Sequence, residues 1–101
     1  MTSRLELQAM LENILESHYV YFQPPASVRM NYPAIVYELG GIDNSHANNL
    51  VYMQDKSYTI TLIDKDPDNK IVDKISHLPK CRFDRFFTSD NLNHYVFTLY
   101  L

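Results

Sequence analysis

The sequence predicts a single α+β domain over residues 1–101, with a mostly antiparallel four-stranded sheet and two helices packed on one face of it. Apolar residues recur at helical spacing in two segments. Four other segments are rich in β-branched and aromatic residues, which is typical of strands. These segments follow one another in the order α-β-β-α-β-β. Because 101 residues suffice for one hydrophobic core, a second domain is not expected.

The first helix is predicted over residues 4–17 from one apolar stripe at helical spacing. Ser3 and Glu6 fit a capping box, in which each side chain hydrogen-bonds the backbone beside the other. The stripe consists of Leu7, Met10, Leu11, Ile14 and Leu15. With no second long helix in the sequence, this stripe is expected to pack on the sheet.

The four strands have clear local patterns and clear breaks between them. In the second strand, Tyr58, Ile60 and Leu62 face one way by the two-residue period of a strand. A hairpin loop, SDNLN, is predicted between the last two strands. The predicted strands span residues 34–39, 56–64, 80–88 and 94–101.

Prolines shape the segment between the first helix and the first strand. Pro24, Pro25 and Pro33 bar a regular helix and cannot donate to a central ladder. We therefore expect an extended connector, with room for an edge strand at Tyr19–Phe22.

The stretch TLIDKDPDNKIVDKI, residues 61–75, begins like a calcium-binding loop. Asp64, Asp66 and Asp68 match the first three ligand positions of that loop. The glycine that makes its sharp turn is replaced by Asn69, and the bidentate glutamate by Ile75. Too few oxygen ligands remain for tight binding, so no metal site is predicted.

The same stretch is better interpreted as a junction between a strand and a short second helix. Asp66 is a favourable N-cap residue, and Pro67 is favoured at the first helical position. Asp68 would complement the positive end of the helix dipole. Apolar residues from Ile71 onward recur at helical spacing, and Pro79 stops the helix.

Composition excludes several classes of function. Only two glycines are present, and they are adjacent, so neither the dinucleotide fingerprint nor the P-loop can be formed. A formal charge of −3 without a basic stripe is unlike that of a protein that neutralises phosphates. No apolar run is long enough to span a membrane, and the first residues lack the apolar region of a secretory signal. We expect no cofactor.

The residues that could carry chemistry show no catalytic or zinc-binding spacing. The four histidines form neither HxxxH nor HxH, and no GxSxG is present. The single cysteine, Cys81, excludes an internal disulfide and is consistent with a reducing compartment. Lys80 and Arg82 beside it could lower its pKa, which leaves a cysteine nucleophile open, although a buried structural cysteine is the commoner case.

Tyrosine is unusually frequent, with eight residues and no tryptophan. Tyrosines in a thin two-layer core can fill it while their hydroxyls reach water. Tyrosine is also enriched at protein interfaces. The excess as a group therefore favours a protein partner.

The phrases RMNYPAIVYELGGIDNSHANN and YTITLIDKDPDNKIVDKISHLPKCRFDRFFTSDNLNHYVFTLYL resemble the tail-completion, or tail-terminator, proteins of long-tailed bacteriophages. The resemblance spans residues 28–101 and includes no catalytic signature. It implies a structural virion protein, not an enzyme, that forms a homo-oligomeric ring, generally of six subunits. Such a ring caps the tail tube and joins it to the head connector protein. The protein would be made in the cytoplasm of the host bacterium and reside at the head-tail junction.

The predicted assembly site is the polar segment 41–56, interpreted as a long loop. Long loops in compact domains are usually functional, and a ring needs two different contact patches on each subunit. A loop with few apolar anchors could order when it contacts the tube or the connector. The candidate residues are Asn44, His46, Asn48, Asn49, Tyr52 and Asp55.

Other functions remain open on sequence alone. A head-closure or minor capsid protein at the same junction would share size, fold class and interface chemistry. A small enzyme subunit using Cys81 with a histidine is a second alternative. A nucleic-acid-associated module is a third, and the acidic charge balance counts against it.

Overall fold

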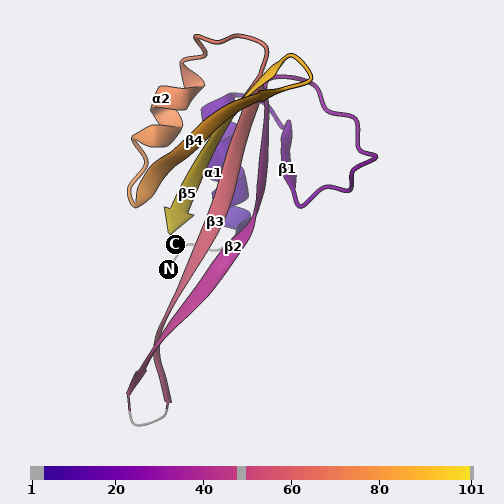
Figure 1. The fold of residues 1–101 in the computed structure, drawn as a ribbon. Helices are drawn as coiled ribbons and strands as arrows, with labels where there is room; N and C mark the ends of the chain where they lie inside the picture. Colours follow the sequence, from indigo (N-terminus) through magenta and orange to yellow (C-terminus); the bar gives the residue numbers. More distant parts are fainter. Residues whose placement is uncertain (1–3, 48–49, 101) are drawn as a thin grey trace.

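The computed structural model describes residues 4–47 and 50–100 of the chain. In that part, two helices lie beside one five-stranded sheet, and a long hairpin projects from it (Figure 1). The elements are α1 (Arg4–Leu15), β1 (Val20–Phe22), β2 (Ala34–Ala47), β3 (Leu50–Asp64), α2 (Ile71–Ser76), β4 (Cys81–Ser89) and β5 (Leu92–Tyr100).

The sheet corrects the predicted fold. Its strand order is β1-β2-β3-β5-β4, with β1 parallel to β2 and every other pair antiparallel. The α+β class is confirmed, but the four-stranded antiparallel arrangement is wrong. The additional strand is Val20–Phe22, which pairs with Ile35–Tyr37 at the edge of the sheet. An edge is where prolines are tolerated, and Pro24 follows this strand almost at once.

The first helix keeps its predicted apolar face but ends earlier than predicted. It stops at Leu15, because Glu16 has a φ of 59° and the Ser17 amide donates to the Glu12 carbonyl at 3.2 Å. A left-handed residue is a common way to end a helix. Its buried residues are Leu7, Leu11 and Leu15. Ser3 of the predicted capping box lies outside the described residues.

Both helices contribute to one core on one face of the sheet. Ile75 of α2 is fully buried, as are Tyr37 and Phe97 from the central strands. The predicted inward face of β3 is confirmed, since Tyr58, Ile60 and Leu62 all belong to this core. The remaining core members are Leu7, Leu11, Leu15, Val20, Ile35 and Leu99.

Polar contacts fix α1 against the sheet. The Tyr37 hydroxyl donates to Gln8 Oε1, and the Gln8 amide donates to the Val20 carbonyl at 3.0 Å. The Arg4 guanidinium donates to the Tyr37 hydroxyl at 3.2 Å and lies 4.5 Å from the centre of the Phe22 ring. These contacts satisfy a buried hydroxyl, which would otherwise carry a desolvation cost.

The last two strands meet in a turn tighter than predicted. Ser89 pairs with Leu92, so only Asp90 and Asn91 form the loop. Their φ values of 54° and 63° are typical of a two-residue type I′ hairpin. Asparagine and aspartate adopt this left-handed region more readily than most residues. The strand predicted from residue 94 therefore begins at Leu92.

Candidate functional site

The acidic stretch after β3 is a self-contained junction. Asp64 is buried, and its carboxylate accepts from the Lys65 amide at 2.7 Å and from the Asn69 side-chain amide. The Tyr95 hydroxyl donates to the Pro67 carbonyl at 2.9 Å and ties the loop to β5. Among the described residues, no three histidine, cysteine or acidic side chains are grouped so that they could hold a metal ion.

The predicted cap of the second helix is wrong. Asp66 accepts from the Asp68 amide at 2.9 Å, which forms a tight Asx-type turn within the loop. Asn69 accepts from the Ile71 amide at 2.8 Å, at the position where α2 begins. Asn69 therefore supplies the side-chain acceptor at the start of α2, a role that was predicted for Asp66.

The loop also changes the acidity of Tyr95. Burial raises the pKa of its hydroxyl above the ordinary value, and the negative charges of Asp68, Asp64 and Asp66 raise it further. The hydroxyl therefore stays protonated and serves as a donor to the loop.

Cys81 is the first residue of β4, close to the predicted start of this strand at residue 80. Its side chain is half-buried. It lines a hollow of about 450 Å³ with Lys80, Arg82 and Tyr100. Burial raises the pKa of the Cys81 thiol, and the charge of Asp84 adds to this effect. The pKa of Cys81 is thus raised and not lowered, which agrees with the commoner case of a structural cysteine. A protonated thiol is a poor nucleophile.

The thiol of Cys81 should react slowly with a disulfide reagent at neutral pH. Only the thiolate attacks, and a raised pKa together with half-burial leaves little of it accessible. The measurement is the second-order rate with Ellman's reagent on the folded protein, compared with the urea-unfolded protein at the same pH. If the thiol reacted faster in the folded protein than in the unfolded protein, the cysteine-dependent enzyme would again be a candidate function.

The hairpin formed by β2 and β3 extends far beyond the rest of the sheet. β1 pairs with β2 only at residues 35–37, and β5 pairs with β3 only at residues 57–64. Among the described residues, the two strands pair only with each other from Glu38 and Lys56 outward, as far as Ala47 and Leu50. We call residues 38–47 and 50–56 the arm. It lengthens the molecule to 51 Å, against 28 and 24 Å in the other directions (Figure 1).

The arm corrects the prediction of a loop over residues 41–56. Its backbone continues the ladder of the sheet, with two irregularities, at Leu39/Gly41 and at Ser45/His46. A strand with neither face against a core has no reason to alternate apolar and polar residues. The segment therefore carried no strand signal in the sequence.

The predicted assembly residues separate along the arm. Asn44 pairs with Gln54, and Asp55 pairs with Asp43. His46 pairs with Val51, and Tyr52 falls in the second irregularity. Asn48 and Asn49 lie outside the described residues. The four described residues thus belong to one projecting element, on two strands instead of one loop.

The outer edge of the sheet is formed by β4, which has a neighbouring strand on one side only. Every residue from Arg82 to Ser89 is exposed, including Phe83 and Phe86, each 49% exposed, and Phe87. These residues were not among the predicted site residues. Three phenylalanines within nine residues, in a strand next to the last, were the available signal. An exposed apolar edge strand is unusual in a monomer.

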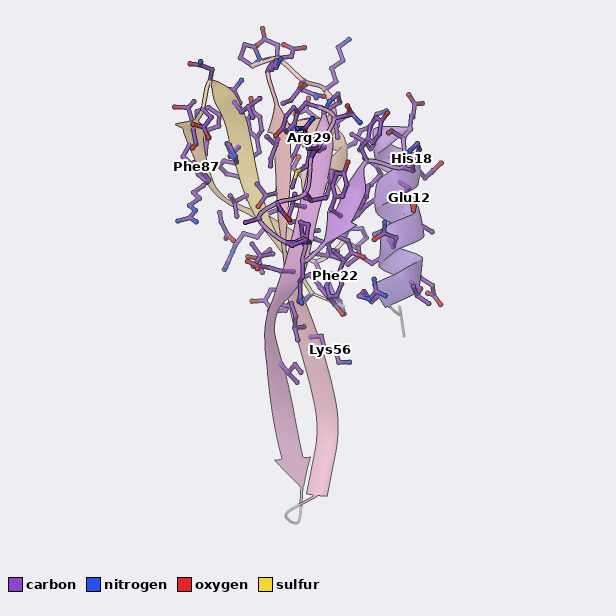
Figure 2. The ribbon with its side chains drawn as sticks, turned by 90° about the vertical axis from the view of Figure 1, so that its right-hand side faces the viewer. Glu12, His18, Phe22, Arg29, Lys56 and Phe87 are labelled. Carbon is purple, nitrogen blue, oxygen red and sulfur yellow. The ribbon has the colours of Figure 1, made fainter. Side chains whose placement is uncertain are left out.

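A hollow of about 390 Å³ lies on the sheet face opposite the helices. Pro24 and Met30 of the connector form one wall, and Phe87 and His94 form the other. The rings of Phe87 and His94 stack, with centroids 4.6 Å apart. Figure 2 shows Phe87 at the side of the sheet away from α1, and Lys56 where the arm begins.

No protein-family model, curated protein or solved structure matches the chain. Within the described part of the chain, no helix has the length and apolar character needed to cross a membrane. The features that bear on function are therefore the arm, the β4 edge and the sequence resemblance.

Proposed function

We propose that this chain is a structural virion protein of a long-tailed bacteriophage that forms a ring on the tail tube and joins it to the head connector. The observation that carries the proposal is the arm, a two-stranded element that leaves the body of the domain. The resemblance of residues 28–101 to tail-completion proteins gives the proposal its biological setting.

The arm supports assembly because it gains little from its own domain. A two-stranded hairpin is marginally stable in water unless another element covers it. The described core residues end at Tyr37 on β2 and resume at Tyr58 on β3, and the arm extends past the strands that flank this part of the sheet. A contact with another protein would supply the missing cover.

The position of the two exposed elements suits a ring. A ring is built from heterologous contacts, in which two different patches of each subunit meet. The arm continues β2 and β3 away from the body, whereas β4 lies along the side of the body (Figure 1). One subunit therefore carries two distinct patches at different places on its surface.

Disruption of the gene in the phage tests the proposal, with particles viewed by negative-stain microscopy. Filled heads beside separate tails of uneven or excessive length are expected for a tail terminator. Emptied heads beside tails of normal length would assign the chain to head closure at the same junction. Intact infectious particles would overturn both assignments. Supply of the intact gene from a plasmid is the control and should restore joined particles.

A further inference from the structure

Two long stretches of strand edge lack a neighbour among the described residues. One is the outer edge of β4, and the other is the arm, whose strands pair only with each other beyond Glu38 and Lys56. The opposite edge of the sheet is different, because β1 has only three residues and Pro24 and Pro25 follow shortly after it. Short edges flanked by proline resist pairing.

The hydrogen-bond pattern shows which groups of β4 are unpaired. The Tyr100 amide donates to the Lys80 carbonyl at 3.1 Å, which sets the phase of the β4–β5 ladder. In an antiparallel ladder, alternate residues turn their backbone groups toward the neighbour and away from it. Because Tyr100 turns its backbone toward β4, the odd-numbered residues of β5, such as Tyr95 and Asn93, turn theirs away from it. Their partners on β4, Phe86 and Thr88, therefore turn their backbone groups toward the open edge. β4 therefore presents backbone donors and acceptors to an added strand.

The side chains of β4 leave that edge accessible. Asp84, at the bulge, pairs with Arg82 at 3.0 Å and accepts from the Thr98 hydroxyl. The Arg85 guanidinium lies 5.4 Å from the centre of the Phe87 ring. Charged side chains on an edge strand often prevent another strand from pairing with it. Here these charged groups interact with side chains of their own sheet instead.

The charges of the two elements are complementary. β4, Cys81–Ser89, includes two arginines and one aspartate. The arm includes three acidic residues and one lysine. Exposed apolar residues accompany both elements, with Phe83 and Phe86 on β4 and Leu39 and Ile42 at the base of the arm. Two copies of β4 placed edge to edge would instead bring like charges together.

We propose that the arm of one copy adds to the open edge of β4 in the next copy and extends its sheet by backbone pairing. The contact is heterologous, so each copy gives an arm to one neighbour and receives one from the other. The inference rests on the proposed function for the closure of these contacts into a ring. The strand addition itself concerns only this chain.

Two variants separate the halves of this contact. In the first, Thr88→Pro removes an outward-facing amide and no bond of the β4–β5 ladder, a position where an edge strand tolerates proline. Its matched control, Thr88→Val, keeps the amide. In the second, Asn-Gly replaces residues 42–56 and closes a two-residue turn between Gly41 and Ser57, which are paired in the hairpin. Thermal unfolding followed by circular dichroism verifies that each variant folds.

Sedimentation velocity of the purified proteins gives the result. The unaltered protein and Thr88→Val should form oligomers larger than a dimer, whereas each of the two variants alone should sediment as a monomer. A mixture of the two variants should form a one-to-one dimer and nothing larger, because only one intact arm and one intact β4 edge can meet. Dimers of the shortened-arm variant alone would indicate symmetric β4 pairing and overturn the proposal.

Hydrogen exchange provides a second measurement that needs no variant. The amides of Phe86 and Thr88 should exchange more slowly as the concentration of the unaltered protein rises, since pairing buries them. A protein that stays monomeric up to ~1 mM, the weak end of specific association, with no such protection, would overturn the contact. If the disrupted gene still left heads and tails unjoined, the proposed function would stand and only this contact would fall.

Discussion

Phage in which Asn-Gly replaces residues 42–56 should yield at least ~100-fold fewer infectious particles, which corresponds to the loss of about 3 kcal/mol of contact free energy. Heads and tails should accumulate unjoined. The purified variant should keep its free energy of unfolding within about 1 kcal/mol of the unaltered protein, as expected for surface changes remote from a core. Particle titres, microscopy and urea unfolding measure the three quantities.

The physical reason is the separation of the arm from the core. Removal of residues 42–56 leaves every described pair between β2 and β3 from Gly41–Ser57 inward, and the core cluster contains no described residue between Tyr37 and Tyr58. Stability and assembly should therefore respond independently. A variant that unfolded would instead place the arm among the elements that stabilise the domain.

A second hairpin provides the control. Replacement of Asp90 and Asn91 by Asn-Gly puts the same dipeptide into the β4–β5 turn, whose φ values already suit it. That variant should assemble normally. Joined, infectious particles from the shortened-arm phage would contradict the assembly role of the arm.

The sequence predicted the elements in which burial of one face imposes a period. The stripe from Leu7 to Leu15 and the alternation from Tyr58 to Leu62 both arise because one face is buried, and both are confirmed. The polar residues of the arm carry no such period, so they were interpreted as a loop. The short β1 strand lies within the segment Tyr19–Phe22, where the sequence left room for an edge strand, but three residues carry too little pattern to count it in the sheet.

The segment 41–56 was chosen from its length and polarity, and its role in assembly stays a prediction; the structure replaces the predicted loop with two paired strands. The exposed edge of β4 was not predicted, because an outward-facing phenylalanine and a core phenylalanine look the same in a sequence. Phe86 and Phe97 both lie in regular strands, yet one is 49% exposed and the other fully buried. Only the pairing order, which puts β4 at the edge, distinguishes them.

Replacement of the buried phenylalanine, Phe97→Ala, should lower the free energy of unfolding by ~3–5 kcal/mol. The ring is fully enclosed between the helices and the sheet, and it meets the Phe83 ring edge-on with centroids 5.6 Å apart. Its loss leaves a cavity that the packed neighbours cannot fill. Because a domain of this size is typically stable by about 5–15 kcal/mol, the variant should be close to unfolding. Urea titration should show a lower midpoint with an unchanged slope.

The exposed phenylalanine gives the matched comparison. Phe86→Ala removes a half-exposed ring that packs on Tyr95, with centroids 5.0 Å apart, and should cost about 1 kcal/mol of stability. If the β4 edge receives a neighbouring arm, this variant should nevertheless weaken oligomers in sedimentation velocity, whereas Phe97→Ala should affect them only by unfolding the chain. Equal stability losses in the two variants would show that β4 is part of the core and not an open edge. Unchanged oligomers in Phe86→Ala would show that the added strand pairs through backbone groups alone, without the aromatic surface.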